Sequence, residues 1–339
     1  MNKKILVSGS TGLLGSHLLI KLAASHDSIL ALYRDLKSIK EVEKLFKFYG
    51  QEAHFSAILW EKGDLLDVER IQDLMEGVDQ VYHCAALVSF NPADAEQLYK
   101  VNVEGTRNIL NGALAKGISK FLHVSSTAAI GSKSANGLST ESTKYHKNDQ
   151  HSFYARSKYS SEREVWRAME EGLDSVIVNP CVIIGPGDPN KSSGAIFSTI
   201  SNGLKFYTEG SNAFVDARDV ASIMVELMNS EIRSERFLCI SENLKFKEVF
   251  DLISDEMGVK RPSIKVNQTM TNIVWRILKV ASLFNGKTPK ITSESARSSH
   301  RNIAYSNQKI KDQIAYEFIP VSASIKNAVN YLKVNQKLK

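Results

Sequence analysis

Cysteine is scarce in this chain of 339 residues, and the few cysteines present do not form pairs. Cys84, Cys181 and Cys239 are far apart, odd in number and each embedded among apolar residues. This pattern argues against a disulfide framework and predicts buried thiols in a reducing compartment. We therefore expect a cytoplasmic protein.

Long apolar runs are missing as well, and no stretch is long enough to span a bilayer. The first apolar run ends at Ser8-Gly9, before the hydrophobic region of a signal peptide could form. The segment Asn272–Phe284 is amphipathic, which predicts a packed helix, with a helix on a membrane surface as the alternative. We expect no membrane partner.

A long block of like charge is also absent. The net charge is +6, and small lysine clusters occur only near residues 37–47 and 333–339. The charge is typical of a solvated surface, and without a basic stripe interleaved with aromatic residues we expect no nucleic-acid partner. The eight histidines lack the spacing of metal ligands, so we expect no metal.

Apolar residues make up 43% and charged residues 24% of the chain, which is typical of a soluble globular protein with a sizeable core. In the first half, short apolar runs alternate with amphipathic stretches. This alternation predicts an α/β fold with a Rossmann-type, doubly wound parallel sheet. The predicted strands are Ile5–Val7, Ile29–Tyr33, Phe55–Trp60, Gln80–Cys84, Phe121–Val124 and Ser175–Val178.

The longest predicted helices cover residues 93–116 and 153–171, and both carry apolar residues on more than one face. Such wide apolar stripes suit either a homodimer interface or burial under the sheet.

After Pro180 the chain becomes rich in Gly, Pro, Asn and Ser, which predicts a smaller, discontinuous C-terminal substrate-binding region. Phe214–Asp216 and Phe237–Ile240 are expected to return to the main sheet as strands. The predicted dinucleotide-binding domain thus comprises residues 1–179 plus about 212–240. The substrate-binding region comprises about 180–211 plus 241–339.

A glycine-rich turn lies between the first predicted strand and an apolar-periodic stretch. It comprises Gly9, Ser10, Thr11, Gly12, Leu13, Leu14 and Gly15, with the spacing G-x-x-G-x-x-G. Glycine allows a tight turn and close approach of backbone N–H groups to phosphate, and a helix N-terminus favours negative charge. The context predicts a dinucleotide pyrophosphate site, with a turn that binds nothing as the alternative.

Tyr154 and Lys158 are four residues apart at the start of a predicted helix, so both side chains share a face. A lysine ammonium there would favour the ionised tyrosine and could hydrogen-bond a cofactor ribose. Tyr154 would then act as a general acid or base. Ser126, at the end of a strand, would donate a hydrogen bond to the substrate oxygen as charge develops on it.

The Tyr-x-x-x-Lys spacing carries little information, because it recurs at Tyr33 with Lys37 and at Tyr305 with Lys309. Context selects Tyr154. That pair follows a strand ending in Ser125-Ser126 and precedes another sheet strand, which places it at the carboxyl edge of the sheet, where ligands bind.

Taken together, these motifs resemble the extended short-chain dehydrogenases/reductases of the NAD-dependent epimerase/dehydratase superfamily, and the resemblance covers nearly the whole chain. The matching segments are residues 9–15 (GSTGLLG), 63–67 (GDLLD), 83–86 (HCAA), 101–106 (VNVEGT), 125–126 (SS), 154–158 (YARSK), 179–180 (NP), 185–188 (GPGD) and 214–221 (FVDARDVA).

The resemblance implies roles for further cofactor-binding residues. It implies that Asp64 and Leu65 line the adenine and that Ala85 and Ala86 line the middle of the cofactor. Pro180 and Val182 would line the nicotinamide carboxamide. Asn102, Tyr154 and Lys158 complete the implied cofactor-binding set.

Within the superfamily, the chain looks most like the dihydroflavonol reductase, aldehyde reductase and 3β-hydroxysteroid dehydrogenase branch. Similar sugar-nucleotide epimerases and dehydratases usually carry an arginine before the strand at Phe214–Asp216, whereas this chain has Gly210-Ser211-Asn212-Ala213. A substrate diphosphate would there lack a bidentate arginine. Arg218 is interpreted as a structural ion-pair residue.

Cofactor choice depends on the end of the second strand, where Arg34 precedes Asp35. A guanidinium there accommodates the 2′-phosphate of NADP, whereas NAD needs a carboxylate at the strand tip. Arg34 favours NADP and Asp35 leaves NAD open. A merely solvated Arg34 is a further alternative.

These features predict an NADP(H)-dependent oxidoreductase that acts on a small molecule, interconverting a ketone or aldehyde and an alcohol. An NAD-dependent sugar-nucleotide epimerase or dehydratase and a non-catalytic dinucleotide-sensing regulator are the alternatives. Mixed apolar and small side chains weakly favour a hydrophobic substrate, with core packing as the other explanation. The candidate pocket residues are Val88, Ser89, Phe90, Cys181, Ile184 and Phe197, together with the polar loop after Gly131.

Overall fold

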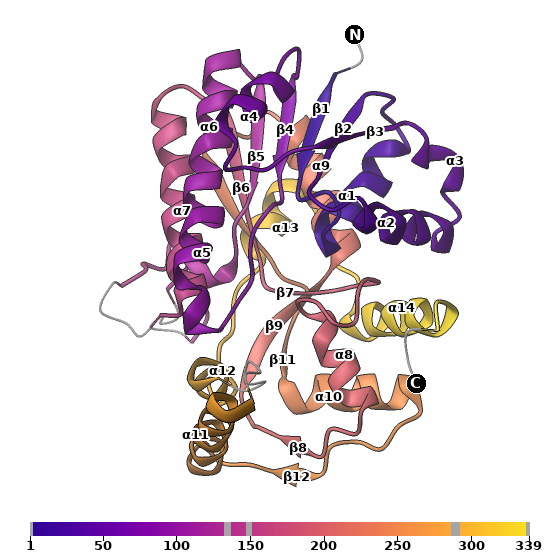
Figure 1. Cartoon of the computed structure of the whole chain (residues 1–339), viewed down its shortest axis with the longest axis vertical. Helices are drawn as coiled ribbons and strands as arrows, with labels where there is room; N and C mark the ends of the chain where they lie inside the picture. The colour runs from indigo at the N-terminus through magenta and orange to yellow at the C-terminus, as the bar shows by residue number, and fades with distance from the viewer. Residues whose placement is uncertain (1–2, 132–136, 147–150, 286–291, 337–339) are drawn as a thin grey trace.

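The computed structural model of the chain describes residues 3–131, 137–146, 151–285 and 292–336, with the side chains of all of these except residues 278–285. Its main sheet has seven parallel strands in the order β10-β6-β5-β4-β1-β2-β3 (Figure 1). The order reverses at β1, and in such sheets ligands bind beyond the carboxyl ends of the strands at this point. The strands are β1 (Ile5–Ser8), β2 (Ile29–Tyr33), β3 (Ile58–Lys62), β4 (Gln80–His83), β5 (Lys120–Val124), β6 (Ser175–Pro180) and β10 (Glu235–Cys239).

The predicted Rossmann-type sheet is therefore confirmed, but one predicted strand, Phe55–Trp60, is wrong at its start. Phe55 ends the short helix α3 (Glu52–Phe55), and β3 begins only at Ile58. The Phe55 ring contacts Phe46 and Trp60, with ring centroids 5.3 and 5.9 Å apart. The apolar run thus joins two elements, which periodicity alone could not separate.

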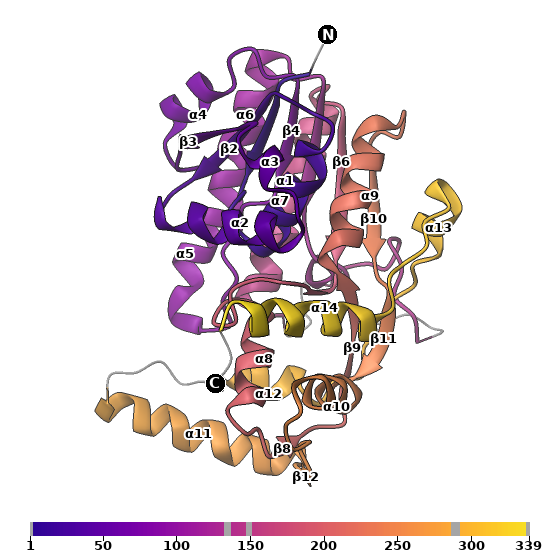
Figure 2. The same ribbon diagram turned by 90° about the vertical axis from the view of Figure 1, so that its right-hand side faces the viewer.

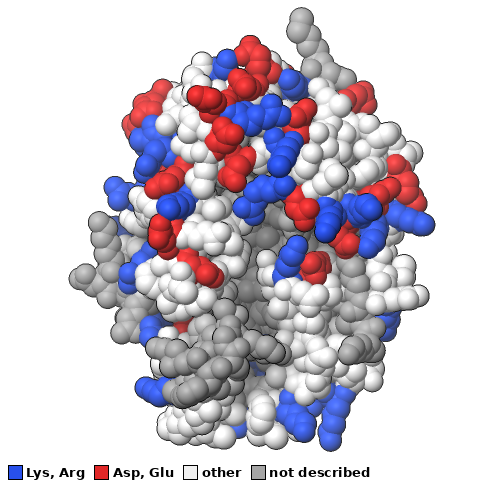
Figure 3. Space-filling view, in the orientation of Figure 1, with Lys and Arg blue, Asp and Glu red and all other residues white. Residues whose placement is uncertain are grey.

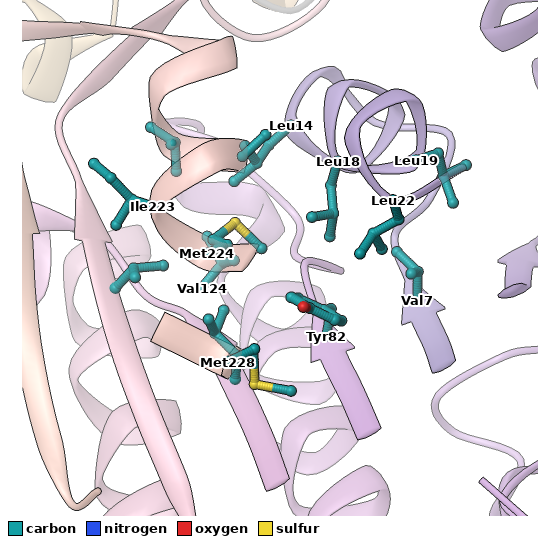
Figure 4. Packing of buried hydrophobic residues seen from close by; sticks show 14 of the residues in the cluster. Val7, Leu14, Leu18, Leu19, Leu22, Tyr82, Val124, Ile223, Met224 and Met228 are labelled. Carbon is teal, nitrogen blue, oxygen red and sulfur yellow. The ribbon is translucent and has the colours of Figure 1, made fainter. Parts of the chain in front are cut away.

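Helices cover both faces of the main sheet. On one face α1 and α9 pack against each other, and Leu18, Leu22 and Met224 fill the space between them and the strands (Figure 4). This face carries α1 (Leu13–Ala23), α2 (Lys37–Phe48), α3, α9 (Ala217–Asn229) and α13 (Gln308–Ile314). The other face carries α4 (Val68–Leu74), α6 (Gly105–Lys116) and α7 (Phe153–Glu170).

The predicted helix over residues 93–116 consists of four consecutive helical segments. A 3₁₀ turn (Pro92–Asp94) leads into α5 (Ala95–Tyr99), then a π-helical turn (Lys100–Glu104) and α6. The predicted helix 153–171 is α7, and its N-cap is Ser152, whose Oγ accepts a hydrogen bond from the Ala155 N–H at 2.7 Å. This cap fixes the first turn of α7, which contains Tyr154.

A second, smaller sheet lies below the main one in Figure 1 and has the order β11-β9-β7. The prediction that Phe214–Asp216 returns to the main sheet is wrong, because β9 pairs with β7 and β11. Phe237–Ile240 does return, as β10, and occupies the place beside β6. The division into dinucleotide-binding and substrate-binding parts stays a proposal. The strands are β7 (Val182–Ile184), β9 (Ser211–Asp216) and β11 (Glu242–Lys245).

The remaining elements surround the second sheet. Figure 2 shows α14 across its top, and α11 with the two-stranded β8–β12 sheet at the far end of the molecule. None of the described helices is long and apolar enough to cross a membrane. The elements are α8 (Gly194–Ser201), β8 (Phe206–Tyr207), α10 (Phe246–Met257), β12 (Ile264–Lys265), α11 (Gln268–Asn285), α12 (Ser293–Ser298) and α14 (Val321–Val334).

Candidate active site

A cavity of about 1070 Å³ runs from the glycine turn after β1 to the segment around α12. Its floor comes from the residues that follow β1, β4, β5 and β6, which meet at one edge of the sheet. The cavity brings together many residues that the sequence predicted. These are Gly9, Gly12, Leu13, Leu14, Gly15, Ala86, Val88, Ser89, Phe90, Ser126, Tyr154, Lys158, Pro180, Cys181 and Val182.

The glycine turn is too crowded for side chains. Gly9 has φ +66°, and a Cβ there would lie 2.5 Å from the Ala85 backbone N. A Cβ on Gly15 would lie 2.2 Å from the Gly9 carbonyl oxygen. Gly12 is the N-cap of α1 and supplies no side chain to the first backbone N–H groups of the helix. The turn therefore fits a dinucleotide pyrophosphate, which needs close backbone approach and free N–H groups at a helix start.

Ser10 and Asn102, both predicted in the cofactor set, make internal hydrogen bonds instead of facing the cavity. The Ser10 hydroxyl donates to the Leu32 carbonyl at 2.6 Å and ties the turn to β2. The Asn102 amide accepts from the Leu87 N–H at 2.7 Å and donates to the Leu87 carbonyl and the Ser157 hydroxyl, both at 2.9 Å. These bonds position the segment after β4 against α7.

Arg34 is exposed immediately after β2, as a ligand of an adenosine ribose would have to be. The carboxylate of its neighbour Asp35 accepts a hydrogen bond from the Lys37 N–H at 3.0 Å, at the start of α2. The Asp64 carboxylate likewise accepts from the Leu66 N–H at 3.0 Å. Leu65 is buried and packs against Gly105. A Cβ added to Gly105 would lie 2.9 Å from the Cβ of Leu65.

Tyr154 and Ser126 both line the cavity floor, and the two side chains are near enough to interact. Burial raises the pKa of Tyr154, and the interaction with Ser126 opposes that shift. Burial therefore favours the neutral phenol. The Ser126 Oγ also accepts from the Ala128 N–H at 3.1 Å, which orients it at the end of β5.

Lys158 lies one turn along α7 and is almost fully buried. Its Nζ donates to the Val124 carbonyl at 2.7 Å. Burial lowers the pKa of Lys158 to about 8, against the opposing charge of Glu162. Burial disfavours the charged forms of both side chains, and the predicted ionisation of Tyr154 by Lys158 stays a prediction.

A buried polar network supports Ser125 and Ser126 from below, and sequence reasoning missed it. Glu162 accepts hydrogen bonds from Ser125 Oγ at 2.8 Å, Asn179 Nδ2 at 2.9 Å and Arg236 Nη1 at 2.7 Å. Asn179 Nδ2 also donates to the Ser126 carbonyl at 3.0 Å. A buried carboxylate is tolerated only when it is paired and hydrogen-bonded, as Glu162 is here.

On the substrate side, four of the six predicted pocket residues line the cavity. The Phe90 ring meets Tyr154 edge-on, with ring centroids 5.9 Å apart, and Ser89 Oγ donates to Asp94 Oδ2 at 2.5 Å. Ile184 and Phe197 were predicted wrongly, because both are buried in the core around α10 and α14. Of the predicted loop after Gly131, residues 132–136 and 147–150 lie outside the described part.

The opposite wall of the cavity comes from a segment that no motif indicated. Glu294, Arg297, Arg301 and Tyr305 line it, together with Arg156 on α7. Glu294 hydrogen-bonds Ser152, and burial raises its pKa against the nearby arginines. Tyr305 hydrogen-bonds Thr127, and burial raises its pKa to about 12. Glu294, Arg297 and Arg301 lie more than a hundred positions after Tyr154, and their spacing carries no sequence signal.

The two other Tyr-x-x-x-Lys pairs and Arg218 have different surroundings. Lys309 Nζ donates to Glu235 Oε2 at 2.5 Å and to the Arg236 carbonyl at 2.8 Å, away from the Tyr305 phenol. Tyr33 ends β2, beyond the cavity lining. Arg218 forms a bidentate ion pair with Asp216, with Nε–Oδ1 and Nη2–Oδ2 distances of 2.9 and 2.7 Å.

The described cysteines are free, and Cys84, Cys181 and Cys239 form no disulfide. Burial raises the pKa of all three thiols. Within the described ranges, no group of three or more His, Cys, Asp or Glu side chains could hold a metal ion.

Comparison with known proteins places this geometry in context. The sequence model of the NAD dependent epimerase/dehydratase family matches residues 5–238. Sterol demethylase protein B of Methylococcus capsulatus is 31% identical over 263 residues, which is 77% of this chain and 76% of that protein. A putative dihydroflavonol 4-reductase of Synechocystis is 28% identical over 334 residues, covering 96% of this chain and 94% of the other. The crystal structure of gox2253 superimposes over the full length of both chains with a TM-score of 0.83 and 27% identity.

Proposed function

The chain belongs to the NAD dependent epimerase/dehydratase family, and from this premise we propose that it interconverts a ketone or aldehyde and an alcohol with NADP(H). Members of this extended short-chain dehydrogenase/reductase family are NAD(P)-dependent enzymes that act on CH–OH groups. The observation that carries the proposal is the convergence of Tyr154, Ser126 and Lys158 on the floor of a cavity that begins at the glycine turn.

The chain's own residues account for the proton side of the reaction. The bound nicotinamide would supply or accept the hydride at the substrate carbon. In reduction, Tyr154 transfers its phenolic proton to the carbonyl oxygen, and Ser126 donates a hydrogen bond to that oxygen as charge develops. Lys158, whose pKa is about 8, can carry a charge near neutral pH that stabilises the resulting phenolate and can bond the ribose.

The glycine turn and Arg34 support NADP as the cofactor. Gly9, Gly12 and Gly15 would hold the pyrophosphate through backbone N–H groups. Arg34 is exposed after β2, whereas the carboxylate of Asp35 already caps α2. A guanidinium in this position pairs with a 2′-phosphate, so we propose NADP over NAD.

For the substrate we propose a largely apolar, multi-ring ketone, aldehyde or alcohol. Val88, Phe90, Phe153 and Ile196 line the cavity near Tyr154. The names of the two relatives refer to a sterol and a dihydroflavonol, which are molecules of this kind. Apolar side chains near the reacting groups suit such a ligand.

A sugar-nucleotide epimerase or dehydratase is the second candidate, and one observation favours it. The sequence argument against it was the missing arginine at Gly210–Ala213. Arg156, Arg297 and Arg301 nevertheless line the cavity from other elements. Guanidinium groups form strong bidentate bonds to a diphosphate. A cofactor that copurifies with the protein, together with turnover of a nucleotide sugar without net cofactor oxidation, would favour this candidate.

The deciding experiment is a panel of ketones, aldehydes, alcohols and nucleotide sugars, monitored at the nicotinamide absorbance, after a fluorescence titration of NADPH against NADH. We expect NADPH to bind more tightly and a multi-ring carbonyl compound to oxidise it. NADPH binding without turnover of any compound would contradict this function and favour a dinucleotide-sensing regulator.

A homodimer through residues 93–116 and 153–171 and a cytoplasmic location also remain proposals. The apolar residues that suggested the dimer, such as Ile109 and Val165, pack on the main sheet. The dimer interface would then be polar, around ion pairs such as Arg107–Glu164 at 2.8 Å. A monomer in sedimentation at micromolar concentration would contradict the dimer.

A further inference from the structure

The excess of positive over negative charge in the chain comes from one segment. Residues 258–293 contain seven Lys and Arg residues and no Asp or Glu. The rest of the chain has 36 Lys and Arg against 37 Asp and Glu, so this segment accounts for the net charge of +6. The seven basic residues are Lys260, Arg261, Lys265, Arg276, Lys279, Lys287 and Lys290.

The same segment presents an apolar helix face to solvent. Met270, Ile273, Val274 and Ile277 on α11 have exposed fractions between 42% and 61%. Their spacing of three and four residues puts them on one face of the helix. The opposite side is anchored, because Thr271 Oγ1 lies 2.8 Å from His300 Nε2 and α11 packs on α12. The apolar face therefore points away from the body of the protein.

Neighbouring elements extend this surface. Phe206 on β8 and Ile264 on β12 are 50% and 44% exposed, and the two strands pair with each other. β12 directly precedes α11 in the sequence. Figure 2 shows α11 and the β8–β12 sheet together at the far end of the molecule. In Figure 3 the lowest part of the visible face carries blue side chains and no red ones.

The basic residues of this segment indicate which kind of partner binds the surface. Arg276 lies on α11 beside the apolar face, with its guanidinium stacked 5.0 Å over the Trp275 ring. Arg261 and Lys265 pair with Asp255 and Glu209, which lie outside the segment. A second copy of the chain would bring a second positive segment against the first and be repelled, whereas an anionic surface is attracted. A basic amphipathic helix is typical of binding in the plane of a bilayer.

From the unpartnered apolar face and the charge around it, we propose that α11 and the β8–β12 sheet dock the protein on an anionic phospholipid bilayer. The apolar side chains enter the headgroup boundary, and the basic side chains pair with lipid phosphates. The proposal goes beyond the enzymatic function and does not depend on it. It also departs from the sequence-based expectation of no membrane partner. Because α12 is both the support of α11 and a wall of the cavity, the bilayer would lie beside that wall.

Vesicle flotation of the full chain tests the proposal. We expect binding to phosphatidylcholine vesicles with about one third phosphatidylglycerol, weak binding to pure phosphatidylcholine, and release by salt. The double substitution Ile273→Asp and Ile277→Asp should reduce binding by about 100-fold, since two apolar side chains no longer enter the bilayer. Arg276→Glu should reduce it roughly fivefold or more.

Val334→Asp is the control, because Val334 is an apolar residue, 70% exposed, on a different helix, α14. It should leave vesicle binding unchanged, and all variants should keep the melting temperature and NADPH affinity of the parent. If the double variant fails to fold, Arg276→Glu still gives the test. Absence of binding to anionic vesicles, equal binding to neutral ones, or binding that survives the α11 substitutions would overturn the proposal. A dimer in sedimentation that these substitutions abolish would also overturn it, and would assign the face to a second copy.

Discussion

The two walls of the cavity are built in different ways. The floor consists of short segments that each follow a strand of the main sheet, such as Gly9–Gly15 after β1 and Ser125-Ser126 after β5. The opposite wall comes from residues 292–305, which form no strand of the main sheet. Parallel topology brings the floor residues together whatever their distance in sequence, whereas the opposite wall depends on tertiary packing.

The walls also differ in how deeply their charged side chains are buried. Behind the floor, Glu162 joins Ser125, Asn179 and Arg236 in one buried network. On the opposite wall, Arg297 and Arg301 are exposed. We infer that the floor performs chemistry common to the family and that the opposite wall adapts the cavity to a particular substrate. Substitutions on the two walls should therefore have different kinetic effects.

The largest effect is expected at the floor, for Tyr154→Phe. Without the phenolic proton, kcat should fall by about 10³-fold, since general acid catalysis contributes on this scale. The NADPH dissociation constant should change less than about twofold, because the ring still fills its place. Tyr33→Phe, a tyrosine with the same spacing to a lysine, should leave both quantities unchanged. Turnover retained by Tyr154→Phe would remove the proposed role.

The next largest effect should follow Gly15→Ala, which tests whether the glycine turn holds the cofactor pyrophosphate. Its Cβ would lie 2.2 Å from the Gly9 carbonyl oxygen, so the turn must shift. NADPH affinity should fall by about 10- to 100-fold, the scale of an overpacked site. The matched control is Gly112→Ala in α6, where the nearest atom is 3.5 Å from the new Cβ. Equal affinity in both variants, measured by fluorescence titration, would show that the turn holds no phosphate.

A smaller effect is expected for Arg34→Ala, which tests cofactor choice on the floor side. Loss of a charged hydrogen bond to the 2′-phosphate should weaken NADPH binding about tenfold and leave NADH binding unchanged. Parallel titrations with both cofactors measure the ratio. If the two affinities are already equal in the parent protein, or if Arg34→Ala weakens neither, the preference for NADP is wrong.

The smallest effect should come from the opposite wall, for Arg297→Ala. With an apolar substrate, KM should change by about threefold or less and kcat should stay the same, as for an exposed charge on a rim. Steady-state kinetics with the carbonyl compound that the panel identifies provides the comparison. A loss of 100-fold or more in kcat/KM with a nucleotide sugar would instead make this wall a diphosphate site.

The glycine turn, Ser126, Tyr154 and Lys158 lie together on the floor, and each of them has a local signature in the sequence. A glycine turn after an apolar strand and a Tyr-x-x-x-Lys pair at a helix start report their place in a parallel sheet. The sequence failed where two environments share one pattern. Ile184 and Phe197 lie in the core, but a substrate pocket would favour the same apolar residue types. Phe214–Asp216 is a strand of the second sheet, but its sequence would equally suit a strand of the main sheet. The lowering of the Lys158 pKa by burial and the position of Arg297 in the cavity lining both depend on tertiary packing. The spacing of residues in the sequence does not report that packing.

The most direct test of the central claim follows deuterium from NADPH labelled at the C4 hydride position. With the best carbonyl compound from the panel, the account predicts an alcohol with one deuterium on the former carbonyl carbon and one NADPH oxidised per product. With the Tyr154→Phe variant in place of the parent protein, no deuterium should appear in the alcohol product. Product formed without deuterium, or without net oxidation of NADPH, would contradict the account.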